Sequence, residues 1–475
     1  MRQSFGFDSE SALLPAVVVA CAAALLLGGS AGPRHFGDVV IQIAAVPMIA
    51  LVVHATLAEP GRARGPSRVA AGIALSAIAI GLLQLIPLPP ALWTLLPGHR
   101  TVASALALLD PDPPWLPVAT SPTAVWRSLA FVAPAIALFF AAGRLDERGR
   151  RLVLLLICAT PLVDVAFAVG QLASGPDGIW DPYGSSSSAA TTGLFANRNH
   201  FGALIHATIP FVVALAAWGG RRHRSYAPVI WIGAAALLML MLLGALTSRS
   251  RAGSFLAFLS FALSMRFLIF GGSPSRARGG GTLRWLVTGA IVLGIVALDF
   301  GFWRVADRIA LSPLEDYRST ILQVAVRAFF EHLPFGSGLG TYVAVHQALE
   351  RPQEMLQVFV NAAHNDFVQI AVETGLPGVA ALLAHAIWFT RVQIGVQSSI
   401  GSDFDTISAQ AAGLSAFMLM CHSVVEYPLR TGTLLFVFAF ANGLTAAAKV
   451  SSAGGAEEGD GGRARSGPVG SRRRR

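Results

Sequence analysis

The residues best suited to chemistry are one histidine and three arginines that lie at the ends of long apolar runs. His364 opens a dense polar cluster just before an apolar segment, and a neutral histidine can act as a general base at neutral pH. Arg249 and Arg251 lie in a short turn between two strongly apolar segments, and Arg318 opens a predicted helix. This pattern indicates proton transfer and anion binding at a membrane boundary.

The arginines in the short turn oppose the general distribution of positive charge in the chain. An arginine at mid-bilayer costs about 2.5–3.5 kcal/mol on insertion scales, so its presence favours an anionic partner. Two simpler interpretations stay open: Arg249 and Arg251 can extend to lipid headgroups, and Arg318 can form a local salt bridge with Glu315 or Asp316.

The elements that hold these residues are predicted to be membrane helices. Of the 475 residues, 54% are hydrophobic and 13% are charged, whereas soluble domains carry about 25% charged residues. Apolar runs of about twenty residues recur along the chain, so lipid is the expected solvent. The sequence predicts an all-α integral membrane protein with about twelve transmembrane helices, near residues 11–29, 37–58, 69–87, 126–142, 152–172, 199–217, 227–245, 252–270, 285–302, 375–393, 405–422 and 431–448.

The orientation of these helices follows from the loops. Lys and Arg gather in alternate loops, which places both termini in the cytoplasm and the candidate residues on the other side. The net charge of +9 is therefore a topology signal and does not indicate a nucleic-acid partner. Cys21, Cys158 and Cys421 all lie in apolar runs without metal-ligand spacing, so we expect no disulfide and no zinc site.

The chain divides into a membrane domain and a tail. Residues 1–449 are predicted to form the polytopic membrane domain, with a large, partly helical periplasmic segment at 303–374 between helices 9 and 10. Within that segment the spacing predicts a helix, a tight glycine turn and a second helix. Residues 450–475 lack apolar periodicity and are predicted to be a disordered cytoplasmic tail.

Other polar residues near the boundary are weaker candidates. Asn197, Arg198 and Asn199 could contact a substrate, although asparagines at a helix start are often caps. Asn365 lies beside His364, and Glu373 more simply orients its neighbours than acts as a second base.

Five stretches of the sequence, at residues 192–202, 250–253, 318–340, 364–378 and 422–428, belong together. In combination they resemble the O-antigen ligase and O-antigen polymerase superfamily of bacterial membrane glycosyltransferases. Each stretch is common on its own, but their order, spacing and shared outward placement make the combination specific. They span roughly residues 190–430, which we take as the ligase-like core.

The resemblance implies a reaction and roles for the candidate residues. A glycan on a polyprenyl-pyrophosphate donor would be transferred to an acceptor hydroxyl on a glycan or lipid core, at the periplasmic face of the inner membrane. Arg251 and Arg318 would bind the pyrophosphate, with Arg249 as a close competitor because the Ser-Arg pair is duplicated. His364 would deprotonate the acceptor, and no metal or cofactor is implied. In-line displacement with inversion would place the arginines and His364 on opposite walls of one cavity.

Several alternatives stay open from the sequence. Ligase and polymerase differ in the acceptor, which no motif reveals. A transporter or flippase for lipid-linked oligosaccharides would place polar residues deep in several helices, and a scaffold would need no arginine cluster. Peptidoglycan polymerases use a carboxylate base in an outer loop, a role that Asp316 or Glu315 could take.

Overall fold

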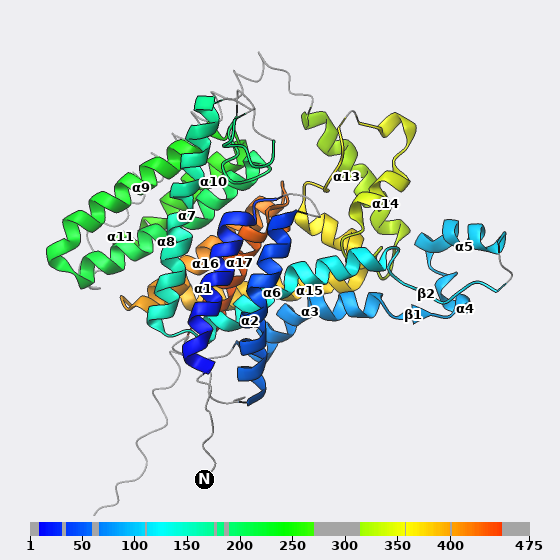
Figure 1. Cartoon of the computed structure of the whole chain (residues 1–475), viewed down its shortest axis with the longest axis horizontal. Coiled ribbons are helices and arrows are strands. Elements are labelled where there is room, and N and C mark those ends of the chain that lie inside the picture. Colours follow the sequence, from blue (N-terminus) through cyan, green and yellow to red (C-terminus); the bar gives the residue numbers. More distant parts are fainter. Residues whose placement is uncertain are drawn as a thin grey trace, which may run out of the picture.

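The computed structural model of the protein is built almost entirely of helices (Figure 1). It describes residues 9–30, 35–58, 66–109, 112–174, 178–184, 190–269, 314–356, 358–399 and 401–448. The helices, numbered as in Figure 1, are α1 (Ser9–Leu27), α2 (Phe36–Ala58), α3 (Arg68–Gln84), α4 (Pro90–Trp93), α5 (Arg100–Ala107), α6 (Pro122–Arg144), α7 (Glu147–Ser174), α8 (Arg198–Arg222), α9 (Ala227–Thr247), α10 (Arg251–Ser264), α11 (Arg266–Ile269), α13 (Leu314–Glu331), α14 (Tyr342–Leu349), α15 (Asp366–Ser398), α16 (Phe404–Ser423) and α17 (Gly432–Ala447).

The helices have the length and composition of a multi-pass membrane protein. Within the described residues, six helical segments are long and apolar enough to cross a membrane, and four shorter apolar helices accompany them. The expected span at 405–422 coincides with α16, whereas the expected span at 285–302 and the predicted tail lie outside the described residues. The total of twelve spans stays a prediction.

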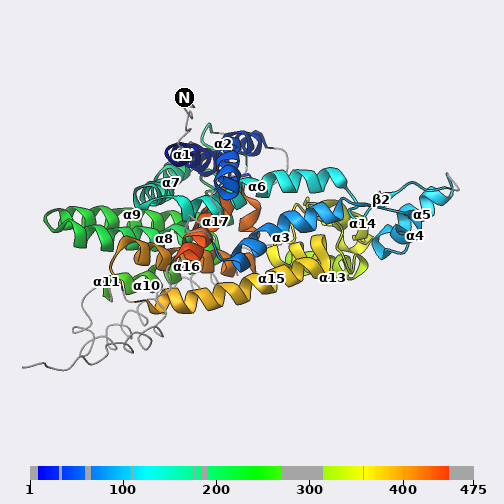
Figure 2. The same cartoon turned by 90° about the horizontal axis from the view of Figure 1, so that it is seen from below.

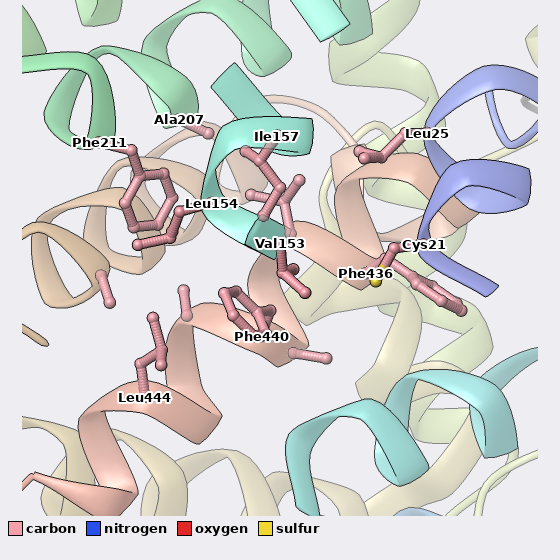
Figure 3. Close-up of a cluster of buried hydrophobic side chains, with 14 of the residues drawn as sticks. Cys21, Leu25, Val153, Leu154, Ile157, Ala207, Phe211, Phe436, Phe440 and Leu444 are labelled. Atoms are coloured by element: carbon pink, nitrogen blue, oxygen red, sulfur yellow. The ribbon is translucent and has the colours of Figure 1, made fainter. Parts of the chain in front are cut away.

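Helix α8 is the centre of the bundle. In its most apolar window 89% of the residues are buried, compared with 17% in the segment that contains α9, which leaves α9 free to face lipid. Figure 3 shows part of the core around α8, where Phe211 lies near Leu154 of α7, and Phe440 and Leu444 of α17 lie nearby. A helix that is apolar all round needs such a buried position or a lipid environment.

Two smaller units extend beyond the bundle at one end (Figure 2). One contains α4 and α5 together with β1 (Pro87–Leu88) and β2 (Leu116–Pro117), which pair antiparallel with Pro87 opposite Pro117. The other contains α13 and α14, which pack against α15. The unit of α13 and α14 lies in the segment at 303–374 that the charge pattern predicts to lie outside.

The glycine turn between α13 and α14 is fixed onto a kink in α15. Gly375 interrupts α15 with φ of 60°, and the amide of Leu376 there donates to the carbonyl of Pro334 at 2.8 Å. The amide of Gly338 donates to the carbonyl of Glu373 at 2.9 Å, so the turn takes up carbonyls that the kink releases from the helix. A Cβ at Gly375 would lie 2.2 Å from the Pro334 oxygen, which leaves room for glycine alone.

This kink corrects one boundary expected from the sequence. The span expected at 375–393 begins earlier, because Asn365 caps a helix that already starts at Asp366 and accepts a hydrogen bond from the Val368 amide at 3.0 Å. The glycine and proline at 375–378, which indicate a helix start, are instead the kink within a longer helix.

Candidate active site

One polar cavity of about 260 Å³ collects the candidate residues from four distant parts of the sequence. They come from loops or helix ends that the charge pattern assigns to the same side of the membrane. The lining residues are Asn197, Arg198, Asn199, Arg249, Arg251, Ala252, Tyr317, Arg318, Ile321, Val358, Phe359, Val360, His364 and Glu426.

The turn that carries Arg249 and Arg251 is brought to the cavity by small residues. Ser250 caps α10 by accepting a hydrogen bond from the Gly253 amide at 3.0 Å. Gly253 packs closely on Gly202 of α8, where an added Cβ would lie 2.9 Å from the Gly253 Cα. This contact holds the arginine turn beside the start of α8, and both Arg249 and Arg251 line the cavity.

Backbone strain is concentrated in this cavity. In the described part of the chain, Arg249 (φ 51°) and His364 (φ 50°) are the two non-glycine residues with positive φ, and both belong to the lining. Left-handed backbone costs such residues about 1–3 kcal/mol and persists where the surroundings impose it, often at functional sites.

A buried carboxylate, Glu426, holds the site residues together. One carboxylate oxygen accepts hydrogen bonds from Arg318 and from the Asn199 Nδ2 at 2.6 Å. The other lies 3.2 Å from the His364 Nδ1. Glu426 is 1% exposed, and burial alone would raise the pKa of its carboxyl. The hydrogen bond from His364, with the charges of His364 and Arg318, instead holds the pKa of Glu426 below its usual range.

This arrangement defines the tautomer of the histidine. An ionised carboxylate only accepts hydrogen bonds, so Nδ1 of His364 donates, and in the neutral ring Nε2 is the nitrogen that keeps its lone pair. The Tyr427 ring packs edge-on against His364 with centroids 5.0 Å apart. Its hydroxyl accepts hydrogen bonds from the Asn361 Nδ2 at 3.2 Å and the Asn197 Nδ2 at 3.4 Å.

One detail of the predicted geometry needs correction. The arginines and His364 do line one cavity, but Arg318 and His364 bind the two oxygens of one carboxylate and are therefore neighbours, not residues of opposite walls. Arg318 pairs with Glu426; the side chains of the local acids, Glu315 and Asp316, are outside the described residues, so a local salt bridge stays a prediction.

The weaker candidates divide into lining and supporting positions. Asn197 caps α8, accepting a hydrogen bond from the Asn199 amide at 2.8 Å, and also lines the cavity with Arg198 and Asn199. Among the described lining residues neither Asn365 nor Glu373 occurs. Asn365 caps α15, and Glu373 is buried in an ion pair with Arg430 at 3.0 Å.

Sequence reasoning overlooked the roles of Glu426 and Tyr427. The stretch 422–428 contributed to the resemblance, yet no role was assigned to its acid. The sequence did contain a signal for Glu426: it is an acidic residue at the end of an apolar run, on the side of the membrane where Arg249 and Arg251 are predicted to lie.

The fold and the cavity define a multi-pass membrane protein with an arginine-lined site at one end of its bundle. A family model described as O-antigen ligase matches residues 234–383, which include Arg249, Arg251, Arg318 and His364. Over these residues the chain is similar to the O-antigen ligase family, which confirms the resemblance that the motifs predict. No curated protein matches the chain. Asn199 and Glu426 lie outside the matched segment and reach the site through the fold.

Proposed function

We propose that the protein is a glycosyltransferase that moves a glycan from a polyprenyl-pyrophosphate donor to an acceptor hydroxyl on the periplasmic face of the bacterial inner membrane. The observation that carries this proposal is the single cavity lined by Arg249, Arg251, Arg318 and His364. The setting is the biosynthesis of a surface polysaccharide, either lipopolysaccharide O-antigen or exopolysaccharide.

The arginines are assigned to the leaving group. As the bond between the anomeric carbon and the pyrophosphate oxygen breaks, negative charge grows on the phosphate. Fixed guanidinium groups bind phosphate oxygens with strong charge-assisted hydrogen bonds, and their effect is greatest when they stabilise the charge that develops in the transition state. In this mechanism the arginines, rather than a metal ion, neutralise the leaving pyrophosphate.

His364 is assigned to the acceptor. Its Nε2 accepts the proton of the acceptor hydroxyl while that oxygen forms the new bond to the anomeric carbon. The electron pair of the broken bond stays on the pyrophosphate, and attack opposite the leaving group inverts the configuration at the sugar carbon. Glu426 acts as a positioning residue: it fixes the His364 tautomer and stabilises the imidazolium that forms.

The acceptor decides between ligase and polymerase. A ligase would use a lipid core and a polymerase another glycan repeat, and both reactions share the pyrophosphate and the base. The proposal keeps both termini in the cytoplasm and includes membrane lipids, but no nucleic acid, among the partners.

Complementation of a deletion strain tests the proposal. Wild type, His364→Ala, Arg318→Ala, Arg249→Ala and Arg251→Ala are expressed at matched membrane abundance, and surface glycan and lipid-linked donor are both measured. Arg327→Ala is the control, because Arg327 forms an ion pair with Glu354 at 2.6 Å and does not line the cavity.

We expect wild type and the control to restore the glycan, and His364→Ala and Arg318→Ala to accumulate donor on the periplasmic face. Comparison of Arg249→Ala with Arg251→Ala shows which arginine of the turn contributes more. Donor that accumulates on the cytoplasmic face would replace this proposal with the alternative, a flippase for lipid-linked oligosaccharides. Full restoration by His364→Ala would refute the assignment of the base.

A further inference from the structure

Part of the cavity wall has a chemistry that the reaction has not used. Val358, Phe359 and Val360 form an apolar strip within a lining otherwise rich in arginine and asparagine. Phe359 is 71% exposed and Val358 is 45% exposed, and the nearby Met355 is 68% exposed. A group of large apolar side chains beside a polar cavity in an extramembrane loop marks a binding surface more often than a packing feature.

The strip belongs to an anchored loop. Val360 is buried in a small core with Ile321 and Val345. One residue further, Asn361 donates to the Tyr427 hydroxyl at 3.2 Å, and the Ala363 amide donates to Gln369 Oε1 at 3.0 Å. Phe359 is therefore presented to the cavity from a fixed backbone, which lowers the entropy cost of binding to it.

The position of the strip assigns it to one of the two substrates. It precedes His364 by a few residues on the same loop, and the acceptor hydroxyl must come within about 2.6–3.2 Å of that base. The charged part of the donor has its binding groups in the arginines. An aromatic face attracts the C–H face of a sugar ring, whereas it offers a pyrophosphate nothing.

We propose that Phe359, flanked by Val358, is the platform on which a sugar ring of the acceptor stacks before transfer. The inference rests on the proposed transferase function and names its acceptor-side specificity residue. The acceptor is thus expected to present a saccharide to the loop, whether that saccharide is carried by a lipid core or by another repeat unit.

The experiment uses the purified full-length protein and two extracts of the deletion strain. The polyprenyl-pyrophosphate glycan fraction serves as donor, and the envelope glycolipid fraction without pyrophosphate-linked glycan serves as acceptor; each is varied at a fixed level of the other. Variants are Phe359→Ser, Phe359→Tyr and Phe359→Leu. Phe330→Ser is the matched control, because Phe330 is 64% exposed on α13 but does not line the cavity.

We expect Phe359→Ser to raise the acceptor concentration for half-maximal rate by about tenfold, which corresponds to about 1.4 kcal/mol, with less than a twofold change for the donor. Phe359→Tyr keeps the aromatic face and should behave as wild type, whereas Phe359→Leu should resemble the serine variant. Phe330→Ser should have no effect.

Two results would overturn the platform. Wild-type behaviour of Phe359→Leu would show that apolar character alone suffices, as for a lipid-facing side chain. An equal change for donor and acceptor would remove the acceptor assignment. Inactive His364→Ala alongside unaffected Phe359 variants would refute this inference alone, whereas active His364→Ala would refute the proposed base.

Discussion

Replacement of Glu426 by glutamine removes one charge from the centre of the cavity while it keeps the size of the side chain. Glu426 contacts Arg318, His364 and Asn199 through its two oxygens. The glutamine amide can still accept from one of these donors, but it turns an N–H toward another. We expect the fold to persist, because glutamine keeps the size of the side chain and leaves a half-exposed Arg318 in reach of water.

The size of the effect follows from the contact with His364. When the base takes its proton, the hydrogen bond at 3.2 Å from the neutral imidazole to the carboxylate becomes a bond between imidazolium and carboxylate. Hydrogen bonds to charged groups contribute about 1.5–3 kcal/mol, and each 1.36 kcal/mol in the barrier changes the rate about tenfold. Glu426→Gln should therefore lower the transfer rate by between about 10-fold and 150-fold.

The assay is single-turnover transfer with saturating donor and acceptor fractions, performed in parallel with thermal unfolding in the same detergent. Glu354→Gln is the matched control. It breaks another pair between a carboxylate and an arginine, at 2.6 Å to Arg327, in the unit formed by α13 and α14 but outside the cavity lining. We expect the control to change the rate by less than about threefold, since a partly exposed pair contributes little.

A Glu426→Gln variant that keeps more than half of the wild-type rate would refute the positioning role. A similar loss of rate in Glu354→Gln would show that the effect comes from destabilisation of the unit formed by α13 and α14. Neither outcome would affect the similarity to the O-antigen ligase family, which rests on residues 234–383.

Three further predictions follow from other contacts. Gly375→Ala should lower the unfolding temperature markedly, because left-handed backbone costs an L-residue about 1–2 kcal/mol and the added Cβ would lie 2.2 Å from the Pro334 oxygen. Gly72→Ala is the control: no atom lies within 4 Å of its added Cβ, so it should not lower the unfolding temperature. Tyr427→Phe keeps the ring against His364 and loses two hydroxyl hydrogen bonds worth about 0.5–1.5 kcal/mol each. The rate should therefore fall by no more than about 150-fold, and a loss above about a thousandfold would contradict this reading. The pKa of Glu426 is lowered in the fold, so its ionised form contributes stability. That contribution is complete above the unfolded pKa of about 4.3 and is lost as the pH falls through the folded value. The difference in unfolding temperature between wild type and Glu426→Gln should therefore stay constant from pH 7 to 5 and shrink below pH 4.

Much of the architecture could be predicted because lipid imposes simple rules on sequence. A membrane helix must be apolar over a fixed length, so the spans near 126–142, 152–172 and 199–217 correspond to α6, α7 and α8. The start of α15 could not be found in this way. Asn365 begins the helix and Gly375 kinks it, and the difference depends on carbonyls taken up by a turn forty residues earlier.

The candidate site residues that depart from the general sequence pattern could be predicted, whereas those that fit the pattern could not. Arg249 and Arg251 oppose the charge distribution, and His364 lies in a dense polar cluster, so each is visible in the sequence. The sequence marks Glu426 only as an acidic residue at the end of an apolar run, and its pairing with Arg318 and His364 becomes visible in the fold. Long-range pairing of this kind has no local sequence signal.

The joint between the glycine turn and the kinked helix also sets a rule for engineering. Gly338 and Pro334 on one side form hydrogen bonds with Glu373 and Leu376 on the other, so the two halves of the joint depend on each other although they are far apart in the chain. A hybrid protein could take the unit formed by α13 and α14 from a relative, to change the glycan that it builds. If the exchanged segment ended at residue 363, the turn and the kinked helix would come from different parents and would not fit together. The exchanged segment must run past Gly375, so that both halves of the joint come from the same parent.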